Sequence, residues 1–259
     1  MTDAVLASGE AKISSRWFYA WMAMTCVAVA VLGFMPTYFV PLMQGQFAAP
    51  PIIHIHGLIF FGWTVLFAAQ AWLVASGQVL VHRTWGMLGV AWATAMVFVV
   101  FATMISRTHL LSDAGFREEQ LAFSWIQIGG ILLFAAFFVL AIVNLKRSDA
   151  HKRLMLVGTI SLLQAPIARW FLVLLAPPLP PDVAAVSPPP PLAITIAPGL
   201  VADLLIVTAI VYDWRTRGKP HPVYLIGGGA VLLFQLTAPL VGGSDGWKSI
   251  AGWIASWGG

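Results

Sequence analysis

The chain has 259 residues, of which 59% are hydrophobic and only 9% are charged, and its formal net charge is +4. Soluble domains carry roughly 25% charged residues, so this composition, with a mean hydropathy of +0.86, excludes a water-soluble globular protein. The apolar stretches run for about twenty residues without alternation, which is typical of transmembrane helices and not of a β-barrel. The only cysteine, Cys26, cannot form an internal disulfide, and the sequence holds no zinc-binding pattern of cysteine and histidine.

Seven apolar segments long enough to cross a membrane as helices follow one another along the chain. They predict helices over 17–42, 52–77, 80–106, 120–145, 153–175, 196–213 and 222–241. We therefore predict an all-α fold, an integral membrane bundle of about seven transmembrane helices. The predicted organisation is an N-terminal segment over 1–16, the helical domain over 17–241 and a tail over 242–259.

Two stretches outside the core of the bundle have distinctive compositions. The loop 176–195 contains two runs of proline, and proline fixes the backbone and lacks a hydrogen-bond donor. We expect this loop to form a stiff, extended cap on the outer end of the bundle. The tail contains Trp247, Trp253 and Trp257, and tryptophan favours the membrane interface. We expect the tail to lie on the membrane surface.

The basic residues are distributed unevenly between the two ends of the predicted bundle. Ten lysines and arginines lie on the side of the N-terminus and three on the other side. Because cytoplasmic loops are enriched in these residues, we predict a cytoplasmic N-terminus and an outside C-terminus, in a multi-pass protein of a bacterial inner membrane. The basic residues lie in short loops, so they indicate topology and not nucleic-acid binding.

Polar residues within the outer half of the predicted helices are candidate functional residues, because placing them in lipid is costly. Four of them lie at a similar depth, namely His56, Gln127, Arg169 and Asp203. We expect an outer polar pocket in which Arg169 and Asp203 form an ion pair. The alternative is that this ion pair only joins two helices and has no further role.

A second group of polar residues lies toward the cytoplasmic side. His82 and His151 stand at the starts of the third and fifth predicted helices, and Gln70 lies near the end of the second. We expect these three residues to form an inner pocket. The alternative is that the histidines, which adjoin Arg83 and Lys152, bind lipid phosphate and enforce topology.

The same polar residues form a pattern over roughly residues 50–170. It consists of His56-Gly57, Gln70, His82-Arg83, Gly86, His151, Met155 and Arg169. This pattern resembles a bacterial family of predicted multi-pass membrane proteins that has no assigned activity, although Thr84-Trp85 departs from it. The resemblance implies a membrane fold and no particular reaction. The layout of histidines on successive helices is also loosely similar to cytochrome b561-type electron carriers, by analogy alone.

Three functions fit these features. The first is electron transfer, with haem b ligated by His56, His82 or His151, or with a quinone held by His56, Gln127 and Arg169 in an aromatic slot. Iron of such a haem is the only metal we expect. The second is a non-catalytic accessory or assembly subunit of a respiratory or photosynthetic complex. The partners we expect are membrane lipids and either a larger membrane complex or further copies of the chain in a homo-oligomer. The third is a proton-coupled transporter, for which buried His, Arg and Asp are typical. A redox or cofactor-binding role is the leading hypothesis.

Overall fold

The computed structural model describes residues 2–47, 49–175 and 187–258, and within these ranges the chain is helical with no β-strand. Seven of its segments are long and apolar enough to cross a membrane: Arg16–Met43, Pro51–Ala75, Val79–Asp113, Arg117–Val143, Ser148–Leu175, Leu192–Arg217 and Pro222–Gly242. The prediction of an all-α chain with seven candidate membrane spans is therefore confirmed. The side of the membrane on which each terminus lies stays a prediction.

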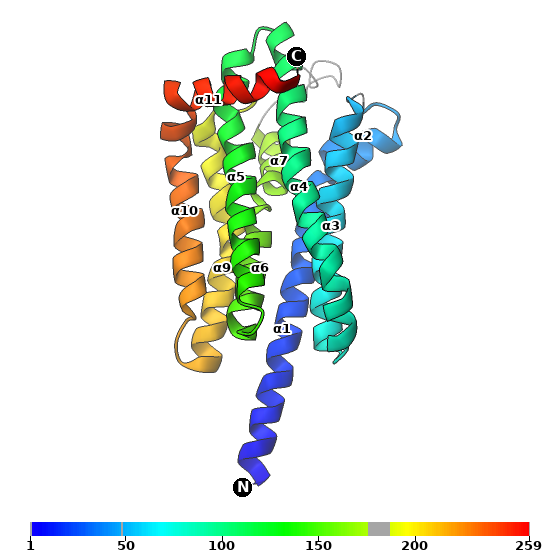
Figure 1. The fold of residues 1–259 in the computed structure, drawn as a ribbon, viewed down its shortest axis with the longest axis vertical. Helices are drawn as coiled ribbons and strands as arrows, with labels where there is room; N and C mark the ends of the chain where they lie inside the picture. Colours follow the sequence, from blue (N-terminus) through cyan, green and yellow to red (C-terminus); the bar gives the residue numbers. More distant parts are fainter. Residues whose placement is uncertain (1, 48, 176–186, 259) are drawn as a thin grey trace.

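The helices form an elongated bundle whose long elements run side by side (Figure 1). Its elements are α1 (Thr2–Phe34), η1 (Met35–Phe39), α2 (Val40–Met43), α3 (Pro51–Ala75), α4 (Val79–Asp113), α5 (Arg117–Val143), α6 (Ser148–Ser161), α7 (Gln164–Leu175), η2 (Leu192–Thr195), α9 (Ile196–Arg217), α10 (Pro222–Gly242), α11 (Asp245–Ala255) and η3 (Ser256–Gly258). We call the end of the bundle that carries α11 the α11 end. The start of α1 extends beyond the opposite end.

The structure describes the predicted tail but only part of the predicted proline loop. The tail forms helix α11, which crosses the α11 end of the bundle (Figure 1). The indole nitrogen of Trp247 donates to the backbone carbonyl of Leu121 at 3.1 Å, which attaches α11 to α5. In the proline loop, residues 176–186 lie outside the described residues, and η2 covers the last turn before α9.

Helix α6 occupies the centre of the bundle, where it packs against α1, α5, α9 and α10. One buried apolar core lies among these helices and includes Cys26, Phe137 and Leu156. A second core joins α3, α4, α5 and α11 and includes Trp63 and Met96. Residues at the start of α6 are therefore held by contacts on several sides, and this packing fixes the positions of the polar groups that α6 carries.

The fifth candidate span is interrupted between α6 and α7. The amide nitrogens of Leu162 and Leu163 bond to carbonyls three residues back, at 3.2 and 2.9 Å, instead of continuing the α-helical pattern. Pro166 lies in the first turn of α7, and proline provides no amide donor to the turn before it. The position of Pro166 therefore accounts for part of this interruption.

Helices α3 and α4 approach each other closely where a glycine faces a tryptophan. The ring of Trp92 on α4 lies directly against Gly62 on α3, and its indole nitrogen donates to the carbonyl of Ile59 at 2.7 Å. A Cβ atom on Gly62 would collide with this ring. Small residues at helix contacts of this kind allow close packing in membranes.

We expect Gly62→Val to lower the free energy of unfolding by about 1–3 kcal/mol, because the added side chain displaces Trp92. The matched control is Gly89→Val on α4, where a Cβ atom meets nothing within 4 Å. Denaturant titration of the detergent-solubilised variants measures the difference. Equal losses of stability in the two variants would contradict this packing.

Candidate functional site

The most buried charges of the described residues form one ion pair near the end of the bundle opposite α11. Arg153 on α6 donates to both carboxylate oxygens of Asp213 on α9, from Nε at 2.9 Å and from Nη2 at 2.6 Å. Both side chains are 1% exposed. This two-point geometry matches the planar guanidinium to the carboxylate and is the strong form of such a pair.

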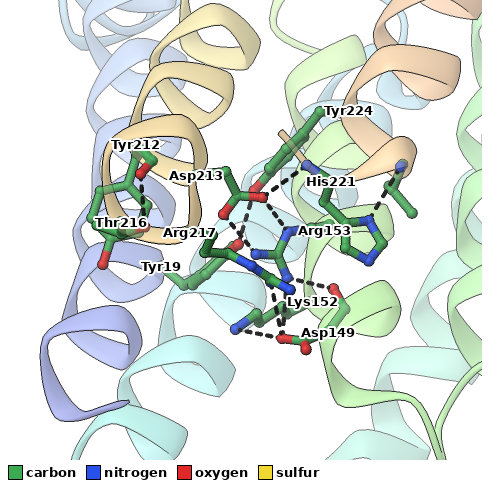
Figure 2. Close-up of polar contacts among 11 residues, drawn as sticks. Tyr19, Asp149, Lys152, Arg153, Tyr212, Asp213, Thr216, Arg217, His221 and Tyr224 are labelled. Carbon is green, nitrogen blue, oxygen red and sulfur yellow. Dashed lines mark hydrogen bonds and ion pairs between the residues drawn. The ribbon is translucent and has the colours of Figure 1, made fainter. Parts of the chain in front are cut away.

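The surroundings of this pair link four helices (Figure 2). The third guanidinium nitrogen of Arg153 donates to the backbone and side-chain oxygens of Asp149, at 2.8 and 3.2 Å. The rings of Tyr19 on α1 and Tyr224 on α10 lie 5.8 and 5.6 Å from the guanidinium carbon. The hydroxyls of these two tyrosines lie 3.0 Å apart and share a hydrogen bond. The Arg153 network, as we call these five residues, therefore joins α1, α6, α9 and α10.

The role of Arg153 differs from the expectation drawn from the sequence. From the sequence, Arg153 is one of the ten basic residues on the predicted cytoplasmic side that indicate topology, and Asp213 has no predicted role. The available signal was Asp213 itself, an acidic residue at the very end of a predicted span in a chain with few charges. Because partners on distant helices cannot be identified from one sequence, this signal did not reveal the pair.

His221 stands between α9 and α10 and connects the network to the start of α10. Its backbone nitrogen donates to Asp213 Oδ2 at 3.2 Å, and its ring Nδ1 accepts from the Val223 amide at 3.2 Å. Burial, followed by the charges of Arg153 and Arg217, holds the pKa of His221 below its ordinary value of 6.5. The neutral ring is therefore favoured, and only the neutral ring has the lone pair that caps α10.

Three of the predicted site residues, Gln70, His82 and His151, lie near one another at this same end, and we call them the His82 cluster. The ring of His82 lies beside the backbone carbonyl of Gln70 and within electrostatic range of His151. His151 Nδ1 lies 2.9 Å from the carbonyl oxygen of Ala141. This nitrogen donates the bond, so the lone pair of the neutral ring lies on Nε2.

Two polar atoms of the His82 cluster are buried without a hydrogen-bond partner among the described residues. They are Nδ1 of His82 and Oε1 of Gln70. Most buried polar atoms in folded proteins have a partner, because an unpaired one costs free energy. Two such atoms on neighbouring helices indicate a place where a polar group of a ligand can bind.

Two of the residues that we expected in an outer pocket lie near each other toward the α11 end. His56 on α3 and Arg169 on α7 are within electrostatic range, and Arg107 on α4 acts on Arg169. The ring of His56 stacks on Phe60 at 4.3 Å between centroids, and its Nδ1 is buried without a partner in the described chain. The guanidinium of Arg169 lies 5.4 Å from the centre of the Phe34 ring.

The other two residues expected in the outer pocket make contacts elsewhere. Gln127 accepts a hydrogen bond at 3.1 Å from Gln120 on the same helix, α5. Asp203 on α9 accepts a hydrogen bond at 3.3 Å from Gln235 on α10. The expected ion pair between Arg169 and Asp203 is not among those of the described residues. The two side chains do not pair because they point to different helices. Asp203 points to α10, while Arg169 points to Phe34 on α1.

No family model matches the chain, and no curated protein or solved structure matches it either. The resemblance of its polar pattern to a bacterial membrane family stays a prediction. A function is therefore inferred from the chemistry of the two clusters and the network.

We expect Asp213→Asn to lower the free energy of unfolding by about 3–5 kcal/mol, because it removes the buried counter-charge of Arg153 and leaves only the exposed carboxylate of Asp149 beside it. Replacing both partners, in Arg153→Met with Asp213→Leu, restores most of this stability, since apolar pairs of similar size often substitute well. Thermal unfolding in detergent compares the variants. The control is Asp113→Asn on the exposed end of α4. If Asp213→Asn is as stable as Asp113→Asn, the Arg153–Asp213 pair contributes little to stability.

We also expect the stability of the protein to fall as the pH decreases below the ordinary pKa of histidine. The pKa of His221 is below 6.5 in the folded state, so protons bind the unfolded state preferentially as the pH decreases. The contribution of the neutral His221 ring to stability is therefore complete above pH 6.5 and is lost below it. Melting temperatures between pH 8 and pH 5 measure this dependence. His221→Asn retains an acceptor for the α10 cap and should flatten the curve. An unchanged curve in this variant would assign the pH dependence to other groups.

Proposed function

We propose that the chain is a quinone-binding protein of a bacterial inner membrane and that the His82 cluster holds an oxygen of the quinone ring. The observation that carries the proposal is the pair of unpartnered buried atoms, His82 Nδ1 and Gln70 Oε1. They belong to neighbouring helices that are apolar enough to span a membrane. A lipid-soluble ligand with a polar oxygen suits such a location.

The types of the unpartnered atoms favour the reduced form of the ligand. The amide oxygen of Gln70 can only accept a hydrogen bond, whereas an imidazole nitrogen donates or accepts according to its tautomer. A quinol hydroxyl donates one hydrogen bond and accepts two, so it can serve both atoms. A quinone carbonyl only accepts and leaves Gln70 without a donor. We therefore expect a quinol to bind more tightly than the corresponding quinone.

The surroundings of the His82 cluster suit a flat apolar ring. Phe67 lies one helical turn from Gln70 and is buried, and Trp85 lies one turn from His82 and is exposed on the outer surface of α4. Val81 beside His82 is also exposed. Binding sites for small molecules commonly combine apolar and aromatic walls with a few polar groups. A ligand can reach the cluster from the hydrocarbon phase, past Val81 and Trp85.

Haem b is a second candidate at the same place, and one observation favours it. The bond of His151 Nδ1 to the Ala141 carbonyl leaves Nε2 free for iron, as for many metal-bound histidines whose other nitrogen donates to an oxygen. The unpartnered nitrogen of His82, however, is Nδ1, which adjoins the Cβ of its own side chain and is crowded at a flat macrocycle. The donor set therefore fits a quinol better than a haem held between His82 and His151.

The proposal is tested with the anaerobic binding of decylubiquinol and decylubiquinone to the purified protein, measured by quenching of tryptophan fluorescence. Gln70→Leu should weaken quinol binding about tenfold, the effect of one hydrogen bond of about 1.4 kcal/mol. It should not lower the melting temperature, because replacing an unpaired buried oxygen by an apolar group costs little. The control is Gln78→Leu on the exposed turn between α3 and α4.

Two results would contradict the quinol site. The first is equal quinol affinity in Gln70→Leu and in the wild type. The second is a Soret band in the purified protein that shifts on reduction with dithionite and disappears in His151→Ala, which would assign the cluster to haem.

A further inference from the structure

Three basic residues lie at similar distances from the helix ends near the α11 end of the bundle, and Arg169 is within electrostatic range of the other two. Arg107 and Arg169 each lie six residues from the ends of α4 and α7 that face this side, and His56 lies five residues from the start of α3. At a rise of about 1.5 Å per residue these separations are about 8–9 Å. We call these three residues the His56 cluster. The cluster is separate from the His82 cluster, which lies at the far end of α3 and α4.

The cluster has positive charge and hydrogen-bond donors, and Arg169 forms no ion pair with an acid of the described residues. Arg169 has no ion pair or hydrogen bond with any described residue, and its charge acts on His56. Two described acidic residues toward this end have other partners. Glu118 pairs with Arg117 and Lys248 at 3.9 and 3.4 Å, and Asp203 accepts from Gln235. The charge of Arg169 is therefore not balanced by a carboxylate of the described chain.

Two buried polar atoms toward this end have no hydrogen-bond partner among the described residues. Nδ1 of His56 is buried without a partner, and so is the hydroxyl oxygen of Thr37. Thr37 stands in η1, the π-helical turn after α1, one turn beyond the Phe34 ring that contacts Arg169. Such π-helical turns are frequent at functional sites. A hydroxyl and an imidazole can both donate hydrogen bonds, which suits an oxyanion between them and the guanidinium.

The position of Arg169 determines how a ligand reaches the cluster. Its side chain is exposed on the outer surface of α7, next to Trp170, which is also exposed and donates to the carbonyl of Leu32 at 3.0 Å. In a membrane-spanning helix this surface faces lipid close to the interface. Guanidinium groups match phosphate with two parallel hydrogen bonds, and this chemistry suits the phosphate of an anionic lipid head group at the interface.

We propose that the His56 cluster is a binding site for a phosphate group and that Arg169 provides its principal contact. An anionic phospholipid of the surrounding leaflet is one source of this group, and free inorganic phosphate is the other. The site is independent of quinol binding, because its residues lie on the opposite half of α3 and α4.

The test is native mass spectrometry of the full-length protein in detergent, titrated with phosphatidylglycerol or with phosphatidylcholine. The wild type should retain phosphatidylglycerol at least tenfold more tightly than Arg169→Gln does, with little difference for phosphatidylcholine. The matched control is Arg117→Gln at the same end, whose side chain is exposed and pairs with Glu118 at the surface. Because Arg169 has no polar partner in the described chain, Arg169→Gln should melt within a few degrees of the wild type.

Inorganic phosphate distinguishes the two sources. If millimolar phosphate raises the melting temperature of the wild type but not of Arg169→Gln, the site accepts a free anion. If only phosphatidylglycerol separates the two proteins, the ligand is the lipid. The proposal is overturned if Arg169→Gln matches the wild type with both ligands, or if Arg117→Gln loses as much lipid affinity as Arg169→Gln, which would indicate general attraction to an anionic surface.

Discussion

The bidentate pair of Arg153 and Asp213 is the interaction on which the rest of the arrangement depends. Two charges that are each 1% exposed can be held away from water only if they satisfy each other, because an isolated buried charge costs several kcal/mol. The pair therefore fixes the start of α6 against the end of α9. Tyr19 and Tyr224 extend this constraint to α1 and α10.

This constraint also positions one member of the His82 cluster. His151 lies two residues before Arg153 on α6, and its ring is held by the carbonyl of Ala141 on α5. The start of α6 thus carries Arg153, which joins helices, and His151, which belongs to the His82 cluster. The contrast between the two groups is informative. The Arg153 network has its hydrogen bonds satisfied, as expected of a structural element, whereas the His82 cluster leaves two buried atoms unpaired. Unpaired atoms of this kind are the observation on which the proposed binding site rests.

The sequence predicted the number of candidate spans and the shared depth of the polar residues, because both depend on spacing along single helices. Depth placed Gln70, His82 and His151 at one level, and it placed His56 and Arg169 at another. It did not identify partners, which depend on which helices are neighbours and on how each is rotated. Asp203 illustrates the limit, since its position along the chain predicts a pair with Arg169 but its carboxylate accepts a hydrogen bond from Gln235. Arg153 illustrates it as well. A basic residue at the end of a predicted span indicates membrane orientation, and its structural role becomes visible only when its buried partner is known.

The most direct test of the proposed quinone site is to locate the bound ligand. The full-length protein in lipid nanodiscs is irradiated with an azidoquinone, and the labelled peptides are identified by mass spectrometry. Labelling should concentrate between Gln70 and Trp85 and at the start of α6, and excess decylubiquinol should suppress it. Labelling spread over the lipid-facing surfaces of all helices, or unaffected by decylubiquinol, would contradict a quinone site at the His82 cluster.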